Sequence, residues 1–235
     1  MTWRNEPMCG LDFETDSPDP EDARIVTACV GFASPDGWEP TTWTLKTTRP
    51  IPAGAQNIHG ITTEHADSAG IDHAAGLVEI RDALRGAWQA GTPVVGWNVV
   101  YDLTVLDREL RRHDLGGLSI DGQVIDGLVL DKAVDRYRKG SRKLVDAAAH
   151  YGVELGAEAH GAEADALAAC RIVWKIGRRY DGLPQSANEL HGYQADAYRE
   201  QRLSFAEYRR EKGQPLDDES TDWPIRPVCT QEVAA

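Results

Sequence analysis

The chain has 235 residues, enough for one good-sized domain and an appendage. Its formal net charge of −13 argues against broad, nonspecific binding to duplex nucleic acid. No apolar run approaches the roughly 20 residues that span a bilayer, and the first residues lack the apolar core of a secretory signal, so we expect no membrane association.

The four cysteines are scattered through the chain and form no Cys-x-x-Cys pair. They are Cys9, Cys29, Cys170 and Cys229. Such isolated cysteines are typical of buried free thiols in a reducing compartment and not of zinc sites or disulfides. The sequence therefore predicts a cytoplasmic protein.

Five segments have the composition and the flanking turns of β-strands. The fourth is fully apolar, as in strands that are buried on both faces of a sheet. The first three follow one another through short connections, including a turn at residues 35–37, which predicts antiparallel pairing. The expected strands are residues 8–13, 24–32, 39–45, 93–97 and 120–125.

Helical patterns alternate with these strands, which predicts the α/β class. Residues 51–63 have neither helical nor strand period and predict a packed surface loop. A late helix has position 165 in its first turn and ends near residue 180. The other expected helices are residues 72–89, 98–113, 127–134, 141–151 and 186–212.

Breaks near residues 182–184 and 213–215 divide the chain into three parts. We expect a main domain over residues 1–183, a C-terminal helical extension over residues 184–213 and an acidic, flexible tail over residues 214–235. The extension is expected to pack on the main domain in preference to another chain, and the oligomeric state stays open.

Two carboxylates, Asp12 and Glu14, stand two residues apart on the first strand, so their side chains point to the same face. Like charges held that close repel each other, and a divalent cation between them would offset the repulsion. The alternative is a solvated acidic strand end, and the pair taken alone favours this alternative.

Further polar residues follow at element boundaries. Asp102 comes after the buried strand, where open α/β sheets place ligand sites, although its charge would also favour a helix N-terminus. Asp126 is expected to be a structural helix N-cap. Asp165 begins the late helix, and Gly161 lets His160 project from the preceding loop toward whatever Asp165 binds.

The richest basic segment is residues 136–143, with five positive charges beside Tyr137. A role in contacting phosphate groups and a solvated connection between helices are about equally favoured by this composition. The net negative charge therefore does not exclude an enzyme that grips a few nucleotides through metal ions and local cationic groups.

In this order the motifs resemble the DEDDh branch of the 3′-5′ exonuclease superfamily, which includes the proofreading subunit of bacterial DNA polymerase III and ribonuclease T. The resemblance covers residues 8–180. The segment at 57–62 also resembles the part of that family that touches the 3′-terminal nucleotide. Where the family often has His and Phe in the second motif, this chain has Trp97 and Tyr101. The motifs that carry the resemblance are residues 11–15, 98–102 and 160–165.

The resemblance implies a ribonuclease H-like fold over the main domain. Its sheet would be mixed and five-stranded, with strands 1–3 antiparallel and strands 4 and 5 parallel to strand 1, flanked by helices. The implied activity is a 3′-5′ exonuclease that hydrolyses phosphodiester bonds at the 3′ end of DNA, preferably single-stranded, and releases nucleoside monophosphates. The implied partners are nucleic-acid 3′ ends and, as an open possibility, a polymerase or another replication protein.

The same resemblance assigns roles to ten residues. Two divalent cations, Mg²⁺ or Mn²⁺, would be held by four catalytic carboxylates, and the imidazole of His160 would act as the general base. The implied metal ligands are Asp12, Glu14, Asp102 and Asp165. The residues expected to hold the terminal nucleotides are Thr15, His59, Ile61, Asn98 and Tyr101.

Three alternatives remain at this stage. The same fold could trim RNA or short oligoribonucleotides, since nothing in the motifs separates ribose from deoxyribose. The chain could be a binding module that has lost catalysis, although a general base has no use in a module that only binds. Finally, the acids could be incidental surface charges, in which case magnesium would not stabilise the protein against melting.

Overall fold

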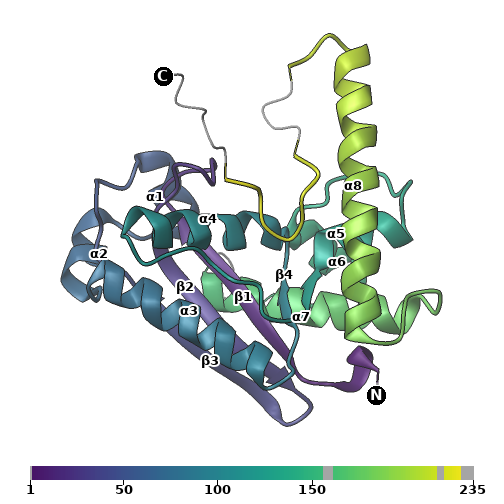
Figure 1. Ribbon diagram of the computed structural model, residues 1–235, viewed down its shortest axis with the longest axis horizontal. Coiled ribbons are helices and arrows are strands. Elements are labelled where there is room, and N and C mark those ends of the chain that lie inside the picture. Colours follow the sequence, from purple (N-terminus) through teal and green to yellow (C-terminus); the bar gives the residue numbers. More distant parts are fainter. Residues whose placement is uncertain (1, 156–160, 216–219, 229–235) are drawn as a thin grey trace.

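The computed structural model describes residues 2–155, 161–215 and 220–228, shown in Figure 1. Five strands form one sheet in the order β3-β2-β1-β4-β5. β1, β2 and β3 pair antiparallel, whereas β4 runs parallel to β1 and β5 parallel to β4, as the predicted mixed sheet requires. The strands are β1 (Met8–Thr15), β2 (Ile25–Ser34), β3 (Gly37–Thr44), β4 (Val94–Gly96) and β5 (Val124–Asp126).

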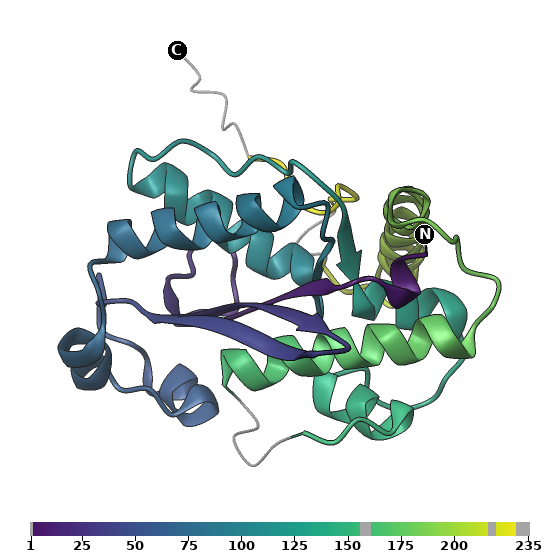
Figure 2. The ribbon, with the colours of Figure 1, turned by 90° about the horizontal axis from the view of Figure 1, so that it is seen from below.

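Helices cover both faces of this sheet, as Figure 2 shows: α3 and α4 lie on one face, and α6 and α7 lie on the other. None of the helices in the described part of the chain is long and apolar enough to cross a bilayer. The helices are the 3₁₀ helix η1 (Trp3–Asn5), α1 (Ala53–His59), α2 (Thr63–Ala69), α3 (His73–Gln89), α4 (Val99–Arg112), α5 (Gly127–Val134), α6 (Leu144–Tyr151), α7 (Ala162–Arg179) and α8 (Ala187–Glu211).

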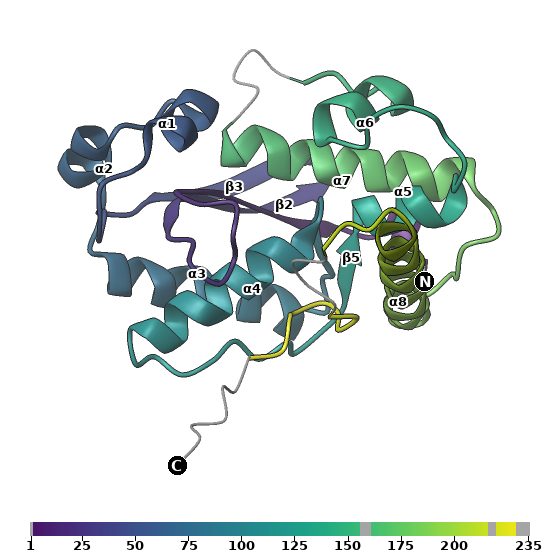
Figure 3. The same cartoon turned by 90° about the horizontal axis from the view of Figure 1, so that it is seen from above.

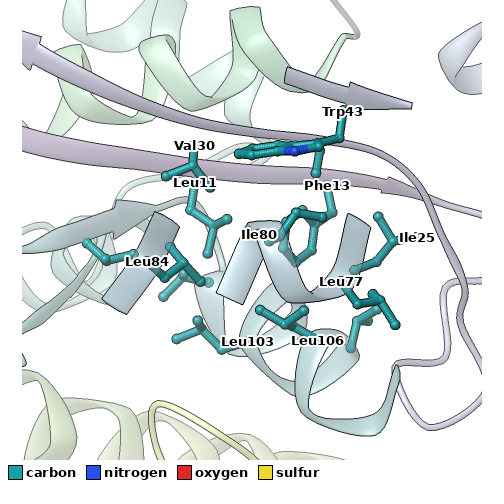
Figure 4. Close-up of a cluster of buried hydrophobic side chains, with 14 of the residues drawn as sticks. Leu11, Phe13, Ile25, Val30, Trp43, Leu77, Ile80, Leu84, Leu103 and Leu106 are labelled. Atoms are coloured by element: carbon teal, nitrogen blue, oxygen red, sulfur yellow. The ribbon is translucent and has the colours of Figure 1, made fainter. Parts of the chain in front are cut away.

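The two faces of β1 carry different side chains, because residues alternate along a strand. Leu11 and Phe13 point into the apolar core beneath α3 and α4, which Figure 4 shows in close-up. Gly10 shares the opposite face with the acidic positions, and a Cβ there would lie 2.9 Å from the carbonyl oxygen of Ala166. Only glycine therefore lets α7 cross β1 this closely, next to Asp12 and Glu14.

Residues 51–63 differ from the packed loop that the sequence predicts, because they contain α1 and the beginning of α2. Each of these helices is too short to show a helical period in the sequence. Residues at their ends define them instead. Gly60 takes the left-handed conformation at the end of α1 (φ 76°), and the Thr62 side chain accepts a hydrogen bond from the His65 N–H to start α2.

The fifth strand is shorter than predicted, since β5 begins only at Val124. Residues 120–123 precede it as a loop, and a Cβ on Gly122 would lie 2.5 Å from the Trp88 ring. The described cysteines are free and buried, as expected, whereas Cys229 lies outside the described residues.

α8 begins with a capping box formed by Ser186 and Glu189, and it packs along α5 and β5. Two of its side chains accept hydrogen bonds from the edge of β5 that no other strand pairs with in the described sheet. The Gln194 amide oxygen accepts from the Asp126 N–H at 2.7 Å, and His191 Nδ1 accepts from the Val124 N–H at 3.0 Å. The extension therefore closes one edge of the sheet.

Residues 220–228 belong to the segment expected to be an acidic, flexible tail, yet they pack against α4. Trp223 and Ile225 contact the apolar core, which explains why this segment does not extend into solvent. The Arg226 N–H donates to Thr104 Oγ1 at 3.1 Å. Arg108 donates to the carbonyl oxygens of Arg226 and Pro227 at 3.1 and 2.8 Å, and Figure 3 shows this segment beside α4.

Candidate active site

Three carboxylates from two elements come together on the α7 side of β1. Asp12 and Glu14 lie on β1, and Asp165 lies in the first turn of α7. Each offers an oxygen, and these oxygens all lie within 4.8 Å of one another. The alternation of β1 and the close crossing of α7 at Gly10 bring these acids together, as their strand and helix positions predict.

Asp102, in the first turn of α4, is the fourth carboxylate and is only 4% exposed. Its Oδ1 accepts a hydrogen bond from the Phe13 N–H at 3.1 Å. This contact places the carboxylate against the backbone between Asp12 and Glu14 and fixes that part of β1 relative to α4. Asp102 thus lies next to the other three acids, and its hydrogen bond to the β1 backbone holds it there.

Asp12, Glu14 and Asp102 have raised pKa values. The pKa of Asp12 is raised by burial and by repulsion from Asp102, Asp165 and Glu14. Burial and the Asp165 charge raise the pKa of Glu14 to about 7. Burial also raises the pKa of Asp102, against the opposing hydrogen bond from Phe13. The site therefore resists carrying four negative charges by itself.

No arginine, lysine or histidine among the described residues forms an ion pair with Asp12 or Glu14. The donor set consists of carboxylate oxygens, which are the ligands that hard divalent cations such as Mg²⁺ and Mn²⁺ prefer. A bound cation would supply positive charge beside Asp12 and Glu14. The residues present therefore fit a divalent-metal centre.

A second group, His73, Glu109 and His113, also brings three possible ligand atoms within 4.8 Å. Here the charge is compensated inside the chain. The buried Glu109 carboxylate lies 2.6 Å from His73 Nε2, accepts a hydrogen bond from the Ile25 N–H and pairs with Arg112. We interpret this group as a structural ion pair.

Thr15 and Tyr101, two of the five predicted substrate contacts, lie together at the end of β1. Their hydroxyl groups are hydrogen-bonded to each other, and the Tyr101 hydroxyl also reaches the carbonyl oxygen of Ser17. The Tyr101 ring is partly buried against the core, so it anchors α4 to the chain that follows β1. Asn98 is exposed at the start of α4, and its N–H donates to Asp126 Oδ1.

Asp126 has the structural role that the sequence predicts. It caps α5 by accepting from the N–H groups of Leu128 and Val129, and burial raises its pKa to about 6. Together with the bond from Asn98, this cap connects the ends of β4 and β5.

His59 and Ile61 lie in and just after α1, which Figures 2 and 3 show on the same side of the sheet as α7. His59 Nδ1 accepts from the Ile61 N–H at 3.0 Å, so Nε2 carries the proton in the neutral ring. This Nε2 is buried and has no hydrogen-bond partner among the described residues. A buried donor without a partner is a position where a ligand oxygen would be favoured.

The sequence alone does not single out Ile58. Its side chain is 68% exposed on α1 beside His59, whereas Ile61 packs against a small apolar cluster that contains Ile51. An exposed isoleucine next to a histidine donor is a candidate contact for a base. Its only signal in the sequence is an apolar residue within a polar segment. His160, the predicted general base, lies outside the described residues.

A 3-2-1-4-5 mixed sheet with acids converging from β1, α4 and α7 defines a ribonuclease H-like nuclease. The sequence profile described as Exonuclease (RNase_T) matches residues 9–173, and the chain belongs to this family of hydrolytic nucleases, which use divalent metals. This confirms the resemblance to DEDDh-type exonucleases. A protein of Escherichia phage 186, described as uncharacterized exonuclease CP81, is 30% identical over 189 residues, which are 74% of this chain and 88% of the phage protein.

Solved structures with the same fold include E. coli exonuclease I bound to a dT13 oligonucleotide, with a TM-score of 0.62 and 22% identity over 74% of this chain. The zinc-bound form of the same enzyme in complex with single-stranded DNA has a TM-score of 0.65 and 21% identity over 83% of this chain. The matches span 41% and 43% of those longer chains, respectively. At this identity the likeness shows a shared ribonuclease H-like fold.

Proposed function

We propose that this protein is a divalent-metal-dependent 3′-5′ exonuclease that removes nucleoside monophosphates from the 3′ end of single-stranded DNA. The observation that carries the proposal is the convergence of Asp12, Glu14 and Asp165, next to the buried Asp102. The solved complexes of E. coli exonuclease I with oligonucleotides support the choice of single-stranded DNA.

In the proposed mechanism, Asp12, Glu14, Asp102 and Asp165 would hold two divalent cations. When bound, such ions lower the pKa of a coordinated water and neutralise phosphoryl oxygens. His160 takes the proton from the attacking water, a role that suits an imidazole near neutral pH. The Asp102 bond to the Phe13 N–H keeps β1 in place so that the acids do not shift during turnover.

Substrate positioning would come from α1 and from the start of α4. The buried Nε2–H of His59 is available to donate to a sugar or phosphate oxygen, and the exposed Ile58 and Asn98 side chains offer contacts to the terminal bases. Thr15 and Tyr101 would hold the end of β1 in position through their shared hydrogen bond. Contacts of this kind depend little on base identity.

The test is a nuclease assay on single-stranded DNA labelled at either end, with Mg²⁺, Mn²⁺ or a chelator, beside RNA of the same sequence. We expect labelled mononucleotide as the first product from the 3′-labelled strand, a ladder of shortened products from the 5′-labelled strand, and no reaction with chelator. The opposite pattern of labels would refute the polarity. Faster cleavage of RNA would refute the choice of DNA, and turnover in chelator would refute the metal dependence.

A further inference from the structure

A groove of about 760 Å³ runs between α5 and α8, and its α8 side lies beyond the family-matched residues 9–173. It is lined by basic side chains, although the whole chain has a net charge of −13. The basic residues of the groove are Lys132, Arg136, Arg138, Arg142 and Arg202. Figure 1 shows α8 standing beside α5 and extending past the edge of the sheet.

The cations of the groove exceed the anions near them. Asp196 and Glu200 line the groove, and the buried Asp131 beneath it binds both Arg138 and Arg142 at 2.6 Å. Five positive groups therefore outnumber the four carboxylates near them, which are Asp196 and Glu200 in the lining and the buried Asp126 and Asp131. This concentration of positive charge would attract a polyanion locally, whatever the net charge of the chain.

Lys132 is the cation most available to a ligand. It is exposed and forms no ion pair with another described residue. The pKa of Lys132 is lowered because part of its side chain is desolvated inside the groove and because Arg142 and Arg202 lie near it. The negative charges of Asp126 and Asp131 oppose this lowering. A phosphate group beside Lys132 would relieve this crowding of positive charge.

α8 contributes aromatic rings to the same groove. Tyr193, Phe205 and Tyr208 are 37%, 47% and 53% exposed, which is unusual for rings that pack only within their own chain. Together with Ala197 and Gln201, they recur every three or four residues, which places them on one face of the helix. From Tyr193 to Tyr208 this face extends about 22 Å along the helix.

The groove reaches the start of α4. Asn98 lines the groove, and it directly precedes α4, whose first turn carries Asp102. Cationic side chains interleaved with exposed rings are the features that bind single strands without regard to sequence, because phosphates meet the charges and bases stack on the rings.

We propose that the α5–α8 groove binds the single strand upstream of the terminal nucleotides that occupy the active site. Lys132 and Arg136 contact phosphates, and bases stack on Phe205 and Tyr208. This inference rests on the proposed function, since it assigns a path to the substrate of that site. The proposal predicts that a substrate gains affinity from the groove only if its strand is long enough to extend from the active site to α8.

The experiment compares dT12 with the dinucleotide dTdT as substrates for wild type, Lys132→Ala and Phe205→Ala. For dT12 we expect Phe205→Ala to raise KM about tenfold with kcat unchanged, the effect of one lost stacking contact. Lys132→Ala should also raise KM and lower the salt dependence of dT12 binding by about 0.7 in the log–log slope. Hydrolysis of dTdT should stay within twofold of wild type for both variants.

The matched controls are Trp174→Ala and Lys175→Ala, which remove an exposed ring and an exposed lysine from α7, outside the groove. They should leave both substrates unaffected. If wild type degrades dT12 and the groove variants behave like these controls, or impair dTdT as much as dT12, the groove proposal is overturned while the nuclease proposal stands.

A separate readout applies if wild type degrades neither substrate. Affinity for fluorescein-labelled dT12 in chelator then tests the groove without catalysis. Weaker binding by Lys132→Ala and Phe205→Ala than by the controls would support the groove even though the nuclease proposal had failed. Equal binding by all variants would overturn the groove as well.

Discussion

The acidic cluster of Asp12, Glu14 and Asp165 and the His73–Glu109–His113 group are similar in the spacing of their ligand atoms but differ in their electrostatics. Both bring three potential metal ligands within 4.8 Å of one another. In the second group the chain supplies the counter-charge, since the Glu109 carboxylate meets Arg112 and His73. In the acidic cluster repulsion and burial raise the pKa of Asp12 and Glu14.

The difference separates a carboxylate that is paired within the chain, Glu109, from two carboxylates, Asp12 and Glu14, that form no ion pair with another described residue. Proximity of ligand atoms alone would rank the two groups equally. The source of the compensating charge distinguishes them, because a carboxylate that already binds a guanidinium and an imidazole has little to gain from a metal ion. Four predictions test this contrast, in order of decreasing effect.

The largest effect is expected for Asp12→Asn, which removes one charge from the acidic cluster. Nuclease activity should be abolished, because the proposed metal site loses a ligand. The free energy of unfolding without metal should stay equal or rise, because repulsion among the acids falls. Asp82→Asn, at an exposed position on α3, is the matched control. Turnover by Asp12→Asn comparable to wild type would refute the assignment.

Removing the predicted general base should slow the reaction and leave metal binding intact. For His160→Ala we expect kcat to fall by roughly 10²–10⁴-fold, the usual contribution of a positioned base. The rise in melting temperature on addition of Mg²⁺ should match that of wild type. Loss of this rise would make His160 a metal ligand, and the acidic cluster would then resemble the histidine-containing group more closely.

Glu109→Gln should have the reverse profile, with a large effect on stability and none on chemistry. Removing a buried carboxylate leaves Arg112 and His73 without their partner, which costs roughly 3–5 kcal/mol. Urea denaturation measures this loss, and Glu64→Gln, at an exposed position of α2, should change stability by less than about 0.5 kcal/mol. Activity per folded molecule should be unchanged; a selective loss of activity would show that this group serves catalysis.

The smallest effect concerns pH. Burial lowers the pKa of His73, but the hydrogen bond and the charge of Glu109 more than offset this, so the pKa is raised. The hydrogen bond with the Lys46 carbonyl oxygen also raises it, whereas the Arg24 charge lowers it. A raised folded-state pKa means that the stabilisation is complete below the unfolded value of about 6.5 and is lost as the pH rises through the folded-state value. The lost stabilisation is about 1.4 kcal/mol for each pH unit that separates the folded-state pKa from the unfolded one.

Urea denaturation of wild type and His73→Gln between pH 6 and pH 9 checks this expectation. The wild-type advantage should shrink as the pH rises. The pKa of Glu109 is lowered by its partners, so this carboxylate stays ionised throughout the range and adds no slope. An advantage that grows with pH would contradict the assignment of a protonated His73.

Much of the acidic cluster could be predicted from sequence because its determinants are local. The period of two along β1 places Asp12 and Glu14 on one face, and the strand-to-helix junction locates Asp102. The caps at Asp126 and Ser186 are also local signals, and both are present. What the sequence could not show is the compensating charge, since Glu109 meets His73 across 36 residues.

Other features depend on contacts between distant segments. Arg138 and Arg142 lie in the basic stretch, but their partner is the buried Asp131, which the sequence does not mark as unusual. The structural interpretation of that stretch thus holds for Arg138 and Arg142, and the phosphate-contacting interpretation stays a prediction for the other cations. The requirement for Gly10 also becomes visible only once α7 is seen to cross β1. Helices as short as α1 and α2, with seven residues each, cannot be predicted from the period of their apolar residues.

The contacts of residues 220–228 with α4 have a consequence for protein engineering. A minimal fragment cut at the end of the family-matched segment would lose α8 and strip Trp223 and Ile225 from the surface they cover. Arg108 would lose two carbonyl acceptors and keep only Glu21 and Asp107. Expression designs that retain residues up to 228 should therefore give more stable protein that aggregates less than shorter designs do.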